Sequence, residues 1–185
     1  MASPIGSMNN VKIFVLYLMK NINYPMDYVT INEIVMQNDY ILFLDFAVAF
    51  HEMLDGDLIE VTGTDPETGA ELYQVTMKGA IVAEELKSDL LSSILDKSLT
   101  CALRCLDFKR RGITVDCTYE PAGDKTYNVT FWIYEKGKVL MQTTVNVDSE
   151  YRSRKMRENF RSRPDVIYRG MVALLTGNVN YLFDK

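Results

Sequence analysis

The spacing of apolar residues in the first half of the chain changes from helical to strand-like in a definite order, and this order restricts the possible folds. Three segments with helical character come first, at residues 11–19, 30–37 and 41–54. Two short strand-like segments follow, residues 58–61 and 71–75, joined by a loop rich in Gly, Thr, Asp and Pro. A period near 3.6 residues indicates a helix, and turn formers between two short apolar runs indicate a hairpin.

A fourth helix over residues 78–86, capped by Thr76, completes this half of the chain. Helix, helix, helix, strand, strand is the order of a winged-helix domain, which we predict over residues 8–87. The alternative is another small α+β domain that contains a hairpin. Residues 1–7 are expected to be an added leader that contributes nothing to the fold, ahead of a natural start at Met8.

Polar residues at the starts of the first two helices predict how their free backbone amides are capped. Asn9 and Asn10 are expected to cap the first helix. Thr30 and Glu33 have the spacing of a capping box, in which the Thr30 side chain caps the second helix and Glu33 reaches back to the Thr30 amide.

The second half of the chain predicts a helix followed by an antiparallel sheet. Residues 88–110 have apolar side chains at spacings of three and four, which is typical of a helix with a wide apolar face. Alternating segments that predict strands follow at residues 113–119, 127–133 and 139–147, with turns at Pro121–Asp124 and Lys136-Gly137. We therefore predict an α+β domain over residues 88–185, with the long helix packed on a three-stranded antiparallel sheet. Two further helices are expected, at residues 149–161 and from Pro164 onward.

The third predicted helix contains neither Lys nor Arg. Its least apolar strip, expected to face outward, consists of Asp45, Val48 or Ala49, Glu52 and Asp55. A helix that reads DNA needs cations and amides for phosphates and base edges, and this strip carries carboxylates instead. The rest of the helix is apolar around most of its circumference. We therefore expect it to be covered on more than one side, by the C-terminal domain or by a second subunit.

The net charge of −5 is unevenly distributed. Residues 1–100 hold 5 Lys and Arg residues against 15 Asp and Glu residues, whereas residues 101–185 hold 15 against 10. A polyanion should therefore prefer the second half. The candidate nucleic-acid-binding residues are Lys109, Arg110, Arg111, Arg152, Arg154, Lys155, Arg157, Arg161 and Arg163. The alternative is a solvated helix face, with the first three complementing a helix C-terminus.

Large apolar residues on the third helix and on the outer face of the predicted sheet are candidates for a dimer or partner interface. They are Phe43, Phe46, Phe50, Trp132, Tyr134 and Leu140.

Three segments of the chain resemble a known family. They are VKIFVLYLMKNINYPM near the start, LYQVTMKGAIVAEEL after the hairpin and NFRSRPDVIYRGMVALL near the end. The chain resembles a family of uncharacterised winged-helix proteins from low-GC Gram-positive bacteria, catalogued only as a domain of unknown function. This resemblance implies a transcriptional regulator by fold, without catalytic or binding residues to carry over.

The chain lacks the sequence signatures of common enzymes and metal proteins. His51 is the single histidine, and Cys101, Cys105 and Cys117 lack a Cys-x-x-Cys spacing, so we expect a structural histidine and reduced thiols. Phosphate-binding glycine motifs, a secretion signal and long apolar runs are also lacking. We expect a cytoplasmic bacterial protein that is not an enzyme, with no catalytic residues, cofactor, metal or membrane contact.

Two hypotheses for function follow from this sequence. The first is a winged-helix transcriptional regulator that binds double-stranded DNA weakly, or through the Arg-rich C-terminal region rather than the third helix. The second is a non-enzymatic protein-interaction or dimerisation module, expected to be a homodimer, whose winged helix no longer binds DNA.

Overall fold

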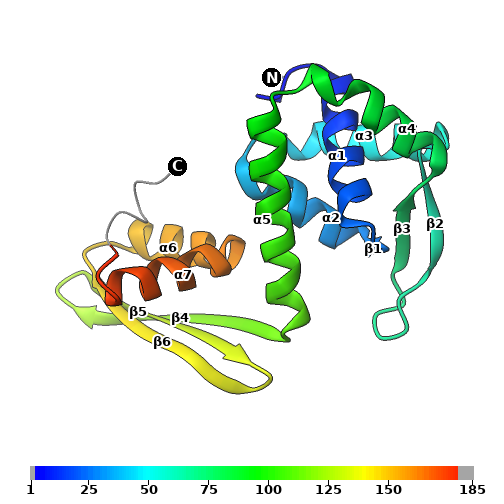
Figure 1. Ribbon diagram of the computed structural model, residues 1–185. Coiled ribbons are helices and arrows are strands. Elements are labelled where there is room, and N and C mark those ends of the chain that lie inside the picture. The colour runs from blue at the N-terminus through cyan, green and yellow to red at the C-terminus, as the bar shows by residue number, and fades with distance from the viewer. Residues whose placement is uncertain (1–2, 179–185) are drawn as a thin grey trace. The chain divides into compact units, whose positions relative to one another are not determined.

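The computed structural model describes residues 3–178 and shows an α+β protein (Figure 1). These residues form seven α-helices and two three-stranded antiparallel sheets. The chain divides into two compact units, an N-terminal unit, Met1–Arg104, and a C-terminal unit, Cys105–Lys185. The division lies within α5 (Ser92–Arg110), later than the predicted boundary at residue 87. In the part of the chain that the structure describes, no helix is both long and apolar enough to cross a membrane.

The N-terminal unit has the predicted order of helices and strands. Its elements are α1 (Met8–Ile22), β1 (Met26–Asp27), α2 (Tyr28–Val35), α3 (Phe43–Asp55), β2 (Ile59–Thr64), β3 (Glu71–Val75) and α4 (Met77–Leu86). Strand β3 lies between β1 and β2 and is antiparallel to both. Figure 1 shows the β2–β3 hairpin extending from the helices as an arm. Strand β1 was not predicted, because two residues are too few to show a period.

Both predicted helix caps are wrong by a few residues. The N-cap of α1 is Ser7, whose hydroxyl accepts from the Asn10 amide at 3.3 Å. The N-cap of α2 is Asp27, whose carboxylate accepts from both the backbone amide and the hydroxyl of Thr30 at 2.8 Å. Each helix therefore begins before the predicted cap, because an earlier Ser or Asp already satisfies the first free amides.

Residues 3–7 make contacts within the N-terminal unit, so excluding them from the predicted fold is wrong, whereas their origin as an added leader stays a prediction. Ser3 donates to the carboxylate of Asp45 from its backbone amide at 2.9 Å and from its hydroxyl at 2.5 Å. Ile5 is buried, and its amide donates to the carbonyl of Tyr40 at 3.0 Å. Together with the Ser7 cap, these bonds attach the start of the chain to the beginning of α3.

Aromatic side chains form the centre of the N-terminal core. Phe46 and Phe50, one turn apart on α3, are both buried. The ring of Tyr28 lies 5.4 Å from that of Phe46 and 4.9 Å from that of Phe50, and Tyr73 contacts Phe50 at 4.9 Å. The contacts join α2, α3 and β3, which explains why the first helices and the hairpin form one unit.

The first part of α5 belongs to the N-terminal unit, and this sets the position of the boundary. Leu95, Ser98 and Ala102 are buried along one face. The Ser98 hydroxyl also accepts from the side-chain amide (Nδ2) of Asn38 at 3.5 Å. The helix begins at Ser92 rather than at the predicted residue 88, because a 3-10 turn and extended backbone at Leu90 separate it from α4.

The C-terminal unit contains the end of α5, a meander and two helices. The meander consists of β4 (Ile113–Gly123), β5 (Thr126–Glu135) and β6 (Lys138–Val147). The predicted two-residue turn at Lys136-Gly137 is confirmed, with φ of 49° and 78°. The turn predicted at Pro121–Asp124 is wrong. A bulge near Pro121 lets β4 continue, and the turn instead lies at Asp124-Lys125, with φ of 45° and 60°.

Helices α6 (Glu150–Ser162) and α7 (Pro164–Leu175) cover one face of this sheet (Figure 1). Phe160 of α6 is 1% exposed, and its ring lies 4.9 Å from that of Phe131 on β5. Ile167 of α7 packs against the same cluster, to which α5 contributes Phe108 from its last turn. The prediction that the long helix packs on the sheet is therefore confirmed only for its last turn, and α6 and α7 supply the rest of the cover. The apolar face of α5 is shared, because its residues up to Arg104 belong to the N-terminal unit and its last turn belongs to the C-terminal unit.

Candidate functional surfaces

The exposed face of α3 is more apolar than predicted. Phe43, Leu44 and Val48 are 54%, 74% and 48% exposed, in the first two turns of the helix. Asp45 lies on the other side, because its carboxylate accepts two bonds from Ser3. No local pattern predicts this contact, because Ser3 and Asp45 are far apart along the chain. The first turns of α3 thus present apolar side chains to solvent where a carboxylate was expected.

The last turns of α3 are polar and partly neutralised. Ala49, one candidate for the strip predicted to face outward, is buried. The polar residues of these turns, His51, Glu52 and Asp55, are exposed. Glu52 forms an ion pair with Lys12 of α1 at 2.6 Å. This exposed ion pair reduces the negative charge of the helix at that point.

The α3 helix and the β2–β3 hairpin together carry no positive side chain. Residues 43–75 contain no Lys or Arg and eight Asp or Glu residues. In the hairpin loop, the backbone amides of Thr68 and Glu67 donate to Asp65 at 2.8 Å each and hold the pKa of its carboxyl below the usual range. At the base of the loop, Tyr73 donates to Glu71 at 2.7 Å, which raises the pKa of Tyr73 to about 12. The loop therefore keeps its negative charge at neutral pH.

Only part of the predicted interface set is available to a partner. Phe46 and Phe50 are buried in the N-terminal core and cannot be interface residues without unfolding it. Phe43 is exposed. Leu140 packs partly against the core of the C-terminal unit.

Trp132 and Tyr134 lie on the face of β5 opposite to Phe131 and Ile133, and both are half-buried. Polar pairs surround them on this face. Thr130 lies across from Thr144, with 3.0 Å between the hydroxyl oxygens, and Asn146 donates to Asn128 at 2.7 Å. The outer face of the sheet is therefore polar, with two aromatic side chains set into it, and is not an extended apolar patch.

The basic residues of α6 separate into two groups. Arg154, Lys155 and Arg161 are exposed and have no ion-pair or hydrogen-bond partner among residues 3–178. The exposed Glu158 follows Arg154 by four residues, Lys155 by three, and precedes Arg161 by three, so it lies beside all of them on the helix surface. This carboxylate weakens the positive potential of the group.

The other predicted cations have structural contacts or lie elsewhere. Arg152 pairs with Asp148 at 3.1 Å, and the Arg157 guanidinium lies 4.1 Å from the centre of the Tyr119 ring. Arg111 pairs with Glu135 at 2.8 Å, which lowers the pKa of Glu135. The remaining three lie at helix ends: Lys109 and Arg110 at the end of α5, and Arg163 between α6 and α7. The nine residues do not form a single free patch.

The nucleophilic and metal-binding residue types lie apart from one another. His51 is exposed, with its Nδ1 atom 2.8 Å from the Ala47 carbonyl oxygen, one turn earlier in the helix. Cys117 is buried in the C-terminal core, and the Cys101 thiol faces the Asn38 side chain at 3.7 Å. Within residues 3–178, no three His, Cys, Asp or Glu side chains lie close enough together to hold a metal ion.

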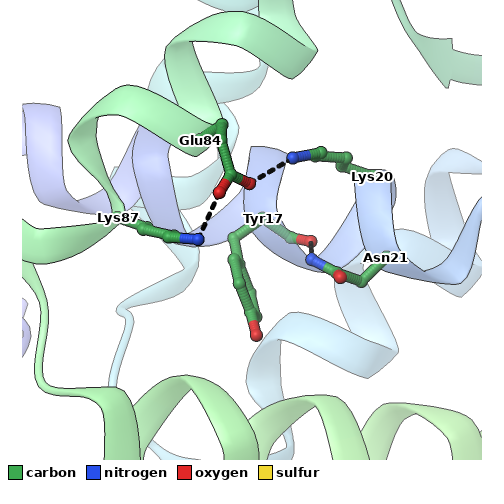
Figure 2. A network of polar contacts seen from close by, with 5 residues as sticks. All are labelled: Tyr17, Lys20, Asn21, Glu84 and Lys87. Carbon is green, nitrogen blue, oxygen red and sulfur yellow. Dashed lines mark hydrogen bonds and ion pairs between the residues drawn. The ribbon is translucent and has the colours of Figure 1, made fainter.

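A group of charges joins α1 to α4 and contains a carboxyl group, that of Glu84, whose pKa is strongly lowered (Figure 2). Glu84 of α4 accepts from Lys20 of α1 at 2.5 Å and from Lys87, and these bonds lower its pKa to about 2. Beside it, Asn21 donates to the Tyr17 carbonyl at 2.8 Å. A shifted pKa can indicate a functional site. Here the half-buried Lys20 and the exposed Lys87 both hold Glu84 between packed helices, so the group is a structural clasp.

This clasp predicts an acid-dependent contribution to stability. The pKa of Glu84 in the folded chain, about 2, is below its ordinary value of 4.5. Its ion pairs therefore stabilise the fold fully above about pH 4.5, and this contribution is lost as the pH falls toward 2. We expect Glu84→Gln to lower the urea concentration at the midpoint of unfolding at neutral pH. The difference between the midpoints of the variant and the original chain should become smaller as the pH falls from about 4.5 toward 2. The control is Glu85→Gln, and a difference that stays constant with pH would contradict the assignment.

By fold, the chain is a two-unit α+β protein with helices on one face of its C-terminal sheet. It belongs to the family described as a domain of unknown function (DUF4364), which matches residues 11–175. The resemblance to a domain of unknown function is thereby confirmed. No curated protein and no solved structure matches the chain. Because the family description names no activity, function has to be argued from the surfaces described above.

Proposed function

We propose that the N-terminal unit is a winged helix, of the kind found in transcriptional regulators, whose third helix contacts protein instead of DNA. The element order α1–β1–α2–α3–β2–β3–α4 and the sheet order β1-β3-β2 support this proposal. In a winged helix, the third helix is the one that enters the major groove, and the hairpin is the wing. Here α3 takes the place of the recognition helix and β2–β3 that of the wing.

The observation that carries the proposal is the absence of Lys and Arg from residues 43–75, combined with exposed Phe43, Leu44 and Val48. Contact with DNA requires cations that replace the condensed counterions of the phosphates. The eight carboxylates of residues 43–75 would instead repel the phosphate backbone. Exposed Phe, Leu and Val side chains gain free energy when another apolar surface covers them, which favours a protein partner.

A photo-crosslinker at the centre of this surface tests the proposal. Phe43 replaced by p-benzoylphenylalanine, which keeps an aromatic side chain, is expected to give protein adducts in irradiated cells. An adduct between two copies would identify the partner as a second copy, as in the predicted homodimer. The matched control is the same replacement at the exposed Tyr151 of α6. Adducts with DNA at position 43, or no adduct at all, would contradict the proposal.

A second candidate function is DNA contact through α6. It is favoured by Arg154, Lys155 and Arg161, which are exposed and lack partners within residues 3–178. These three residues can follow a phosphate backbone, whereas Arg152 and Arg157 have contacts of their own.

We expect three phosphate contacts to give a slope of log K against log salt of about −2.7, measured by the anisotropy of a labelled duplex. Replacing Arg154, Lys155 and Arg161 together with Ala should abolish this slope. The matched control replaces Lys125, Lys136 and Lys138, three exposed lysines in the turns of the sheet. No binding at micromolar protein in low salt rules out this second candidate.

A further inference from the structure

The C-terminal unit contains an apolar pocket of about 260 Å³. Its wall is formed by β5, β6, α6 and α7, so it lies between the sheet and the two helices that cover it. Among residues 3–178, Thr143 and Asn159 are the only lining residues with polar side chains, and none of the lining residues is ionisable. All the lining residues belong to the C-terminal unit, so the pocket does not depend on the N-terminal unit or on the function proposed for it.

Methionines are concentrated at this pocket. The chain has ten methionines, and residues 105–185 contain three of them: Met141, Met156 and Met171. All three line the pocket, one each from β6, α6 and α7. Methionine is unbranched and polarisable, so a methionine wall can adapt to ligands of different shape. A core that needed only to be filled does not require this residue type on three separate elements.

The polar groups of the pocket are suited to a ligand with one hydrogen-bonding group. Within residues 3–178, neither the Thr143 hydroxyl nor the Asn159 side-chain amide hydrogen-bonds to another protein group. Together they can donate to and accept from a ligand. A charged ligand would lose its hydration without finding an opposite charge in the lining, which is unfavourable.

We propose that this pocket binds a neutral, mainly aliphatic or aromatic small molecule that carries one hydrogen-bonding group. Its size corresponds to about ten non-hydrogen atoms, since an apolar cavity of about 150 Å³ holds one benzene molecule. The apolar part contacts the three methionines, and the polar group reaches Thr143 and Asn159.

Titration of the full chain with 1-octanol tests this proposal, with the methionine methyl groups labelled with carbon-13 and observed by NMR. We expect saturable shifts for Met141, Met156 and Met171, with a dissociation constant of about 1 mM or lower. Met53 and Met77 of the N-terminal unit should not shift. Octanoate and octylammonium should bind at least about tenfold more weakly, because each carries a charge into the apolar lining.

A pair of variants on β6 provides the matched control. Val145 lines the pocket and is 38% exposed, whereas Val139 is 58% exposed and is not in the lining. Val145→Trp should obstruct the pocket and weaken octanol binding at least about tenfold, and Val139→Trp should leave it unchanged. Shifts that do not saturate, equal shifts at Met53, or equal binding by Val145→Trp would overturn the proposal. Octanoate binding as tightly as octanol would overturn the assignment of a neutral ligand.

Discussion

Replacing Gly79 with alanine is expected to lower the free energy of unfolding of the N-terminal unit by about 3 kcal/mol. A Cβ atom at this position would lie 2.0 Å from the carbonyl oxygen of Leu58, far inside the contact distance. The atom it meets belongs to the backbone, so no side-chain rotation relieves the overlap. The first turn of α4 would have to move away from the start of β2.

Other contacts hold α4 in this position, so the strain cannot be relieved by a small shift. The Thr76 hydroxyl donates to the Asp57 carbonyl at 2.8 Å and accepts from the Gly79 amide at 3.0 Å. Lys78 donates to the Gly56 carbonyl at 2.7 Å. The sequence Thr-Met-Lys-Gly at residues 76–79 thus ties the start of α4 to the backbone that follows α3. Glycine is required at position 79 because the backbone of α4 lies closest to the Leu58 carbonyl there.

Hydrogen exchange of peptides from residues 8–86 measures the effect within the N-terminal unit. The matched control is Gly63→Ala on β2, where a Cβ atom meets nothing within 4 Å. We expect this control to stay within about 0.5 kcal/mol of the original chain. If Gly79→Ala behaves in the same way as the control, the packing of α4 on Leu58 described above is wrong.

The second large effect is expected for Phe160→Ala, at about 3–5 kcal/mol of the stability of the C-terminal unit. Phe160 is 1% exposed and is the residue of α6 that enters the core beneath the sheet. Its removal leaves a cavity beside Phe131, and the surrounding backbone of α6 and β5 can close it only in part.

The single tryptophan of the chain, Trp132, follows Phe131 on β5. Its fluorescence therefore reports on the unfolding of the C-terminal unit alone. Urea unfolding followed by its fluorescence is therefore the appropriate measurement. Tyr151→Ala removes an exposed aromatic side chain from the same helix and should change stability by less than about 0.5 kcal/mol. Equal effects of the two replacements would show that α6 is not the helix that covers the sheet.

The third helix illustrates which parts of a surface local sequence can predict. Its position and length follow from the apolar spacing of residues 41–54 and from Gly56, and the structure places it at Phe43–Asp55. Its outward face was predicted by choosing the least apolar strip. Asp45 is turned inward because Ser3, distant in the sequence, satisfies its carboxylate. The exposed apolar surface could not be found from the helix alone.

The packing of helices on the C-terminal sheet is a second property that local sequence predicts only in part. The alternation of residues 113–119, 127–133 and 139–147 was sufficient to predict three antiparallel strands. Helix α6 looked like a polar surface helix, because only a narrow strip of its side chains is apolar. A single buried Phe160, with Met156 beside it, is nevertheless enough to attach it to the sheet. Packing of α5 on the sheet was predicted for its whole apolar face, but only its last turn, through Phe108, contacts the sheet core.

The sequence by itself determined the order and kind of the elements apart from β1, the hairpin turn at Lys136-Gly137 and the lack of cations from residue 43 to residue 75. These properties depend on neighbouring residues or on composition. Tertiary structure alone decided which helix covers which surface, which carboxylates face solvent, and that Met141, Met156 and Met171 line one pocket. The physical reason is that burial and pairing depend on contacts between residues distant along the chain, which no local period records.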